Sequence, residues 1–104
     1  MNVYVKSPTV DGSKTRDDFL QIIKENHVAL MVWEKEDRRG EMFDKMTCGD
    51  IVIIAHGANR NKKCFYAGVV DNKEVEINGV KQVKHLSNFI DLTNTTIPFS
   101  KDCS

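Results

Sequence analysis

The sequence predicts an α+β fold: a small, curled, mixed β-barrel of about six strands, flanked by two short helices. The chain has 104 residues, which is the size of one domain. Its apolar runs alternate with helix-like segments in the first half and then follow one another directly, in the order β-α-β-α-β-β-β-β. Because several runs are apolar on both faces, we expect the sheet to curl around its core and to be closed by the helices.

The first half of the chain supplies two strands and a helix. Residues 2–6, NVYVK, alternate β-branched or aromatic residues with others, which is typical of a strand. Thr15 and Asp18 have the spacing of a capping box, so a helix is expected over residues 16–25. Residues 27–33, HVALMVW, are apolar throughout and too short for a typical helix, which indicates a strand that is covered on both faces.

The middle of the chain leads through a short helix into two strands. Residues 41–46, EMFDKM, place three apolar side chains on one face, which predicts one or two helical turns. A left-handed residue at Cys48-Gly49 would end that helix. Two apolar runs follow within residues 49–70, and the polar loop NRNKK, residues 59–63, joins them.

Three residues in these strands are expected to have structural rather than chemical roles. Gly49 would supply a left-handed turn, and Asp50 a local bond from its side chain to the backbone. Gly68 lies inside a strand, where a glycine marks a bulge or the close approach of another backbone. All three therefore point to the fold and not to a reaction.

The third quarter of the chain carries a hairpin signal. In the EVEINGVKQV segment, Asn78-Gly79 lies between two alternating stretches, which is the strongest short-range indication of a two-residue turn. In that register Glu76 would face Lys81, an opposite-charge pair. The HLSNFIDL segment that follows has apolar residues at a spacing of three, so it stays open between a short helix and a covering strand.

The composition limits the classes of function. Lysines plus arginines number 15, as do aspartates plus glutamates, so any nucleic-acid affinity must come from local patches. The three cysteines form no Cys-x-x-Cys pair and the three histidines lie far apart, which predicts a reduced, cytoplasmic protein without a metal or other cofactor. No run approaches the ~18 apolar residues of a membrane span. The chain ends without a helix-ending or strand-ending signal, so residues 1–104 are expected to be a single domain and could be the N-terminal fragment of a longer protein.

The sequence offers little support for an enzyme. His56 directly follows an apolar strand, but no Ser or Cys nucleophile motif accompanies it. The chain also lacks a Gly-rich phosphate loop of either standard spacing. We therefore expect no catalytic residues and no catalytic activity.

Taken in order, these segments resemble a known superfamily. An apolar strand ending in Trp33, a charged loop, a short helix leading into MTCGDIVII and a strand ending in YAGVV resemble the PUA-like superfamily over about residues 2–92. The signature is carried by Met46, Gly49, Asp50, Gly68 and Val69. The EVE and YTH branches are the most similar, especially the EVE domains of modification-dependent restriction systems. The resemblance implies a DNA-binding specificity module in a restriction-modification or antiviral-defence protein, with a fused or neighbouring AAA+ motor or nuclease.

Four side chains are candidates for a pocket that holds a base. Trp33 ends an apolar strand beside a charged loop, where pockets open. Tyr66 and Tyr4 could converge with it as a stacking cage, in which each stacked base gains about 1–3 kcal/mol. His56 could reach the same pocket. The alternative for each aromatic residue is packing in the core, and for His56 a hydrogen bond at the end of a strand.

Basic residues are candidates for contacts with a nucleic-acid backbone. The NRNKK loop has three positive charges and no acid, so it could hold phosphate oxygens; its members are Asn59, Arg60, Asn61, Lys62 and Lys63. Arg38 and Arg39 are further candidates, although the acidic residues around them make a solvated loop the alternative.

The expected function is recognition of nucleic acid, DNA rather than RNA, through a single base, modified or not, that is flipped into an aromatic pocket. The alternative is a protein-interaction or small-ligand-binding module without nucleic-acid affinity, which the zero net charge supports. The two differ in salt dependence, because only contacts with phosphates lose affinity steeply as salt rises.

Overall fold

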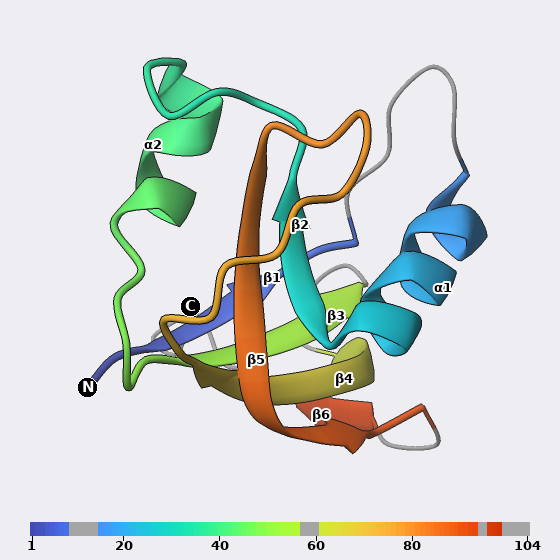
Figure 1. Ribbon diagram of the computed structural model, residues 1–104. Coiled ribbons are helices and arrows are strands. Elements are labelled where there is room, and N and C mark those ends of the chain that lie inside the picture. Colours follow the sequence, from blue (N-terminus) through green and yellow to red (C-terminus); the bar gives the residue numbers. More distant parts are fainter. Residues whose placement is uncertain (9–14, 57–60, 94–95, 99–104) are drawn as a thin grey trace.

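The computed structural model describes residues 1–8, 15–56, 61–93 and 96–98, with residues 61, 62 and 96–98 described only through their backbone. The helices and strands of this part of the chain are shown in Figure 1. In chain order they are β1 (Val3–Lys6), α1 (Arg16–Asn26), β2 (Val28–Met31), α2 (Arg38–Asp44), β3 (Ile51–His56), β4 (Asn61–Val70), β5 (Gln82–Asp91) and β6 (Thr96–Pro98).

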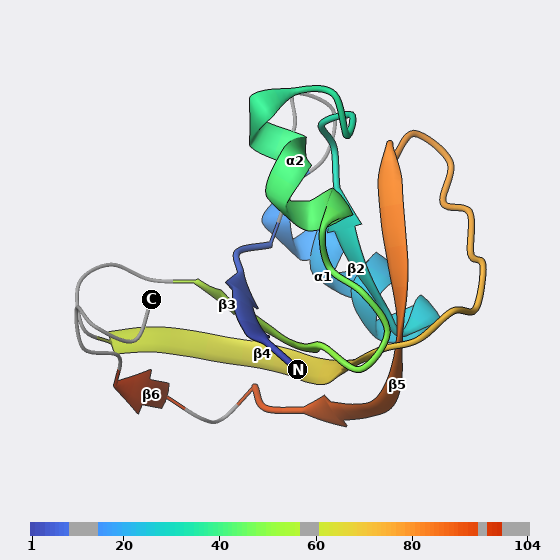
Figure 2. The ribbon, with the colours of Figure 1, turned by 90° about the vertical axis from the view of Figure 1, so that its left-hand side faces the viewer.

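The strands form one mixed sheet in the order β1-β3-β4-β5-β2. β1 and β3 are parallel, and the other neighbours on this path are antiparallel. β5 makes the curl, because residues 82–85 pair with β2 while residues 86–91 pair with β4 (Figures 1 and 2). The predicted α+β class and curled mixed sheet are confirmed as a half-barrel with two helices. Five strands form the curled path instead of about six, and the short β6 lies off it, paired with β4.

The first helix and the strand after it follow their local sequence signals. The Thr15 hydroxyl accepts a hydrogen bond from the Asp18 N–H (3.2 Å), and the Asp18 carboxylate accepts one from the Thr15 N–H (3.0 Å), so the predicted capping box is confirmed. Phe19 and Ile23 bury one face of α1. The helix ends at His27 in a left-handed conformation. All four residues of β2 are buried, which confirms the expectation of a strand covered on both faces, but β2 ends at Met31 and so the prediction that Trp33 ends the strand is wrong.

The second helix begins ahead of the predicted EMFDKM segment. α2 starts at Arg38 because the Asp37 carboxylate accepts a hydrogen bond from the Arg39 N–H (2.8 Å) and caps the helix. The helix ends at Lys45, which is right-handed, so the predicted left-handed end at Cys48-Gly49 is wrong. Gly49 does have a positive φ of 93°, but this residue belongs to the turn that enters β3 and not to the end of α2.

Gly49 and Asp50 have the structural role that the sequence suggested. The buried Asp50 carboxylate accepts hydrogen bonds from the Thr47 N–H (2.9 Å) and the Asn2 N–H (3.0 Å), and these bonds hold its pKa below the usual range. The Gly49 N–H donates to the Val70 carbonyl, and the Val70 N–H donates to the Asp50 carbonyl. This turn therefore ties the start of β3 to both β1 and β4.

The predicted hairpin at Asn78-Gly79 is wrong, although a turn forms there. The Val80 N–H donates to the Ile77 carbonyl (3.1 Å), and Gly79 has a φ of 82° while Asn78 is outside the positive-φ region. One positive φ at the third position is the pattern of a type II turn, whereas a type I′ hairpin turn needs two. The EVEI stretch forms no strand, and HLSNFIDL belongs to β5.

Long-range contacts explain why the hairpin does not form. The start of β5 pairs with β2, whose buried residues would otherwise lack a sheet partner. The Gln82 side-chain amide donates hydrogen bonds to the carbonyls of Trp33 and Gly40, and each bond is 2.9 Å long. The ammonium of Lys81 lies 3.6 Å from the Glu34 carboxylate, so its charged partner comes from the β2–α2 connection and not from across a hairpin.

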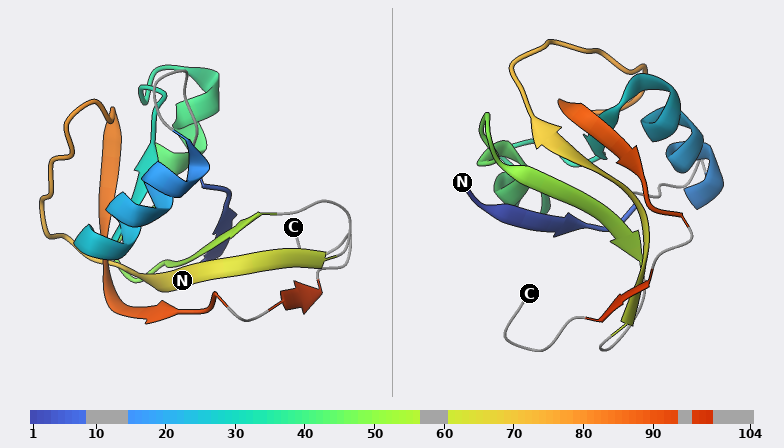
Figure 3. Two further views of the ribbon diagram at one scale, coloured as in Figure 1. Left: turned by 90° about the vertical axis from the view of Figure 1, so that its right-hand side faces the viewer. Right: turned by 90° about the horizontal axis from the view of Figure 1, so that it is seen from below.

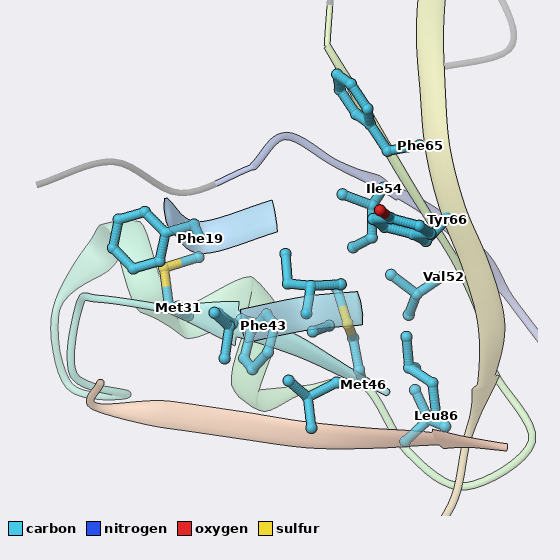
Figure 4. Close-up of a cluster of buried hydrophobic side chains, with 14 residues drawn as sticks. Phe19, Met31, Phe43, Met46, Val52, Ile54, Phe65, Tyr66 and Leu86 are labelled. Atoms are coloured by element: carbon cyan, nitrogen blue, oxygen red, sulfur yellow. The ribbon is translucent and has the colours of Figure 1, made fainter. Parts of the chain in front are cut away.

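Side chains from both helices and the inner side of the sheet meet in one core. Phe19 of α1, Phe43 of α2 and Leu86 of β5 are buried there. Figure 4 shows Ile54 and Tyr66 side by side, as their opposed positions in β3 and β4 require. The core thus occupies the concave side of the half-barrel and includes Ile54 of β3, with Tyr4 of β1 packed against it.

Candidate nucleic-acid interface

The structure brings three of the four predicted pocket residues to one side of the sheet. Tyr4 is opposite Val52, and Tyr66 is opposite Ile54, so both tyrosines share the core-facing side, which we call the inner face. His56 ends β3 two residues beyond Ile54 and is exposed. Trp33 is apart from them, in the connection between β2 and α2 at the top of Figure 1.

Tyr66 is part of the core and not of an open pocket. Its side chain is only 6% exposed and stacks on Phe89, with ring centroids 5.2 Å apart and planes inclined by 25°. Phe89 in turn stacks on His27 at 4.3 Å. Burial, helped by the charge of Asp91, raises the pKa of the Tyr66 hydroxyl. A base could stack on Tyr66 only by displacing Phe89 or the core beside it.

Lys6 is a candidate that the sequence reasoning missed. It is opposite Ile54, which puts it on the inner face with Tyr4. The side chain is partly buried, its ammonium donates to the Ser7 carbonyl (2.9 Å), and burial lowers its pKa to about 8. The alternation of NVYVK was the available signal, because it already places Lys6 on the same face as Tyr4.

Two further basic residues lie beside Lys6. His56 and Lys63 are directly opposed at the end of the β3–β4 pair, and both are exposed. Lys6 is opposite Ile54, so it is a diagonal neighbour of His56, which lies two residues further along β3. The Lys63 ammonium lies 5.8 Å from the centroid of the Phe65 ring. We call Lys6, His56 and Lys63 the basic end.

Two of the five residues of the predicted NRNKK loop fall outside the described part of the chain, and the other three belong to β4. Asn59 and Arg60 are not described. Asn61 and Lys62 are described through their backbone, which pairs with β6 at the start of β4. Lys63 is thus the member of the loop whose side chain can be assigned to the basic end.

Trp33 is not a core residue. Its side chain is 40% exposed, and the Arg39 guanidinium carbon lies 3.3 Å from the ring centroid. Two hydrogen bonds to the Asp37 carboxylate (2.7 and 2.9 Å) hold the guanidinium there and lower the pKa of Asp37 to about 2. Arg38 is exposed at the start of the same helix. Arg39 therefore has two partners in this protein, an aromatic face and a carboxylate.

Open depressions surround the start of β5. The one beside the β2–α2 connection is lined by Glu34, Lys35, Glu36, Asp44, Lys81, Gln82, Val83 and Lys84. Its three lysines are matched by three acids, and two lysines have partners already: Lys81 lies near Glu34 (3.6 Å), and Lys84 donates to the Asp44 carbonyl (3.4 Å). This depression offers an anion little net attraction.

Within the described ranges, no three His, Cys, Asp or Glu side chains are arranged to hold a metal ion. The helices of the same ranges lack the length and apolar character that crossing a membrane requires. No protein-family model, curated protein or solved structure matches this chain. The support for the candidate site therefore comes from the arrangement of its own residues.

The pKa of Lys6 predicts a pH dependence of stability. The pKa of Lys6 is about 8 in the folded protein, below the ordinary value of 10.5. Between pH 8 and 10.5, therefore, Lys6 keeps its proton in the unfolded chain but has released it in the folded chain. Stability should therefore rise with pH in this window, with a slope approaching about 1.4 kcal/mol per pH unit. Urea unfolding from pH 7 to 10.5 should show the rise in the wild type and in the exposed control Lys73→Met, but not in Lys6→Met. Parallel profiles for all three proteins would contradict the assignment.

Proposed function

We propose that this chain is a PUA-like domain of the EVE type and that it reads nucleic acid, with phosphate oxygens held at the basic end. The observation that carries the proposal is the meeting of Lys6, His56 and Lys63 where β1, β3 and β4 adjoin, with Lys63 supplied by the end of the polar NRNKK segment. Charge-assisted hydrogen bonds from such groups are the usual contacts to phosphates. The curled five-stranded sheet with two helices is compatible with this fold family.

The electrostatics of Lys6 support a contact with an anion. With a pKa of about 8, its amino group is mostly protonated at pH 7, yet it is already partly withdrawn from water. Partial burial strengthens its attraction to a phosphate, because the surrounding dielectric is lower than that of water. Since the chain has no net charge, affinity must come from this local cluster. Binding is expected to weaken as pH rises through 8 and Lys6 loses its charge.

Base stacking is assigned to Trp33. Tyr66 is engaged in the core stack, whereas the indole of Trp33 is 40% exposed, with a guanidinium held against its ring. Aromatic and arginine planes are the groups on which unpaired bases stack. Small barrels bind about 4–16 nucleotides of a single strand, and the proposal places Trp33 and the basic end on the path of the same strand.

In its biological setting, the domain would serve as the specificity module of a restriction or defence protein. DNA is the proposed nucleic acid, a fused or neighbouring AAA+ motor or nuclease is the proposed partner, and the domain itself is proposed to catalyse no reaction. A protein-interaction or small-ligand module is the second candidate. The zero net charge and the packing of Tyr66 favour it.

Binding of labelled oligonucleotides, measured by fluorescence anisotropy, tests the proposal. The panel contains single strands and duplexes, with and without modified bases, each at low and at physiological salt. We expect binding that weakens steeply with salt and favours unpaired or modified bases. A domain that binds none of these oligonucleotides at low salt, or binds them with no salt dependence, is not a nucleic-acid reader.

Trp33→Ala is expected to weaken oligonucleotide binding by about 5-fold to 150-fold, because a stacked base is worth about 1–3 kcal/mol. The melting temperature should change little, since the indole lies outside the core. Met42→Ala, which also truncates an exposed apolar residue but on α2, is the matched control. Equal affinities for the two variants would remove Trp33 from the interface.

A further inference from the structure

The side of the sheet opposite the core, which we call the outer face, is almost wholly aliphatic. Opposed positions in β1, β3, β4 and β5 form a first row of Val3, Ile51, Val69 and Ser87. A second row lies two residues further along β1 and β3. Its members are Val5, Ile53, Ala67 and Ile90. Serine is the only polar residue in the two rows, and none of their members is charged.

This face is open to solvent in the described part of the chain. Val3 is 57% exposed and Ile90 is 52% exposed, at the two margins, while Ile51, Ile53 and Val69 between them are partly exposed. Figure 3 (right) looks onto β1 and β3 from below, and neither helix crosses in front of them. A sheet with one solvated face normally alternates apolar and polar residues. β3 and β4 do not alternate, and aliphatic side chains of both rows therefore reach water, whereas Ala67 in the second row is buried.

We infer that the outer face is a self-association surface, on which a second copy of this chain docks. In a twofold contact each residue meets the same patch of the partner, so charged patches of one sign would repel. The two rows carry no charge, and the chain as a whole has a net charge of zero, so neither local nor global repulsion opposes pairing. A nucleic acid or a charged peptide would find no pairing group on this surface.

The dimensions of the molecule suit such a dimer. Two sheets pack face to face about 10 Å apart, with strand directions inclined by about 30°. A stable interface buries about 800 Å² on each partner, and the domain measures 33 × 31 × 28 Å, so one side of it can supply this area. The aliphatic rows would form the dry centre, with Ile53 in the middle because Val5 and Ala67 flank it.

Sedimentation equilibrium over a wide range of protein concentration tests the inference. We expect a reversible dimer for the wild type and at least about a tenfold increase in the dissociation constant for Ile53→Glu, because the dimer would bury two unpaired charges. Met42→Glu adds the same charge to an exposed position on α2 and should dimerise like the wild type. Circular dichroism confirms that each variant is folded.

If Ile53→Glu fails to fold, Val3→Glu tests the same face, because Val3 is an exposed residue at its margin. A monomer at every concentration would overturn the inference, as would a dimer that the glutamates at Ile53 and Val3 leave intact. An equal loss of dimer in Met42→Glu would overturn it too, since the effect would then come from charge alone. None of these outcomes depends on whether the domain binds nucleic acid.

Discussion

The triple variant Lys6→Met, His56→Ala, Lys63→Ala is expected to bind single-stranded oligonucleotides at least about 100-fold more weakly than the wild type. Each hydrogen bond to a charged group contributes about 1.5–3 kcal/mol, and 1.4 kcal/mol corresponds to a factor of ten. The contributions of neighbouring contacts are not fully additive, so the expected loss of affinity is smaller than three separate hydrogen bonds would give. The loss should be similar for all sequences, because phosphate contacts position the strand without reading its bases.

The salt dependence identifies the contacts that are lost. Each phosphate contact from a positive charge to a single strand contributes about 0.7 to the slope of log affinity against log salt, so the loss of the two lysines should lower this slope by about 1.4 in the triple variant. The control is Lys24→Ala, Lys45→Ala, Lys73→Ala, which removes three exposed charges from α1, the end of α2 and the β4–β5 connection. If this control weakens binding as much, general charge sets the affinity and the basic end has no special role.

Gly68→Ala is expected to lower the free energy of unfolding by about 1–3 kcal/mol, the usual cost of adding a carbon to a closely packed site. A Cβ at Gly68 would lie 2.7 Å from the Leu86 Cβ and 3.1 Å from the Ser87 carbonyl oxygen. These atoms belong to β5 at the point where its pairing with β4 shifts register, so the two strands would have to separate. For a domain of this size, each kcal/mol lowers the melting temperature by roughly 4–8 °C.

The effect should be specific to the close approach of two strands. A Cβ at Gly49 would meet no atom within 4 Å, and asparagine tolerates its positive φ better than most residues do, so Gly49→Asn should cost much less. Thermal unfolding of both variants gives the comparison. An unchanged melting temperature for Gly68→Ala would mean that β4 and β5 can separate here without cost.

The candidate site could be predicted only in part. Trp33 was correctly expected to lie outside the core, because a charged loop follows it directly in the sequence. For Tyr66 the sequence left both a pocket and the core open, and the structure shows that Phe89 and the core around Ile54 cover it. The sequence indicated Lys6 only through the alternation of NVYVK, because its lowered pKa comes from burial in the folded protein.

Features that depend on neighbours along the chain can be derived from the sequence alone. Thr15 and Asp18 cap α1, Gly49 supplies a positive φ, and four consecutive apolar residues become the buried β2. The tertiary structure alone decided which strands pair. Residues 82–85 bind β2 across more than fifty positions of sequence and not the adjacent EVEI stretch, because burying β2 requires partners for its backbone groups that a local hairpin cannot provide.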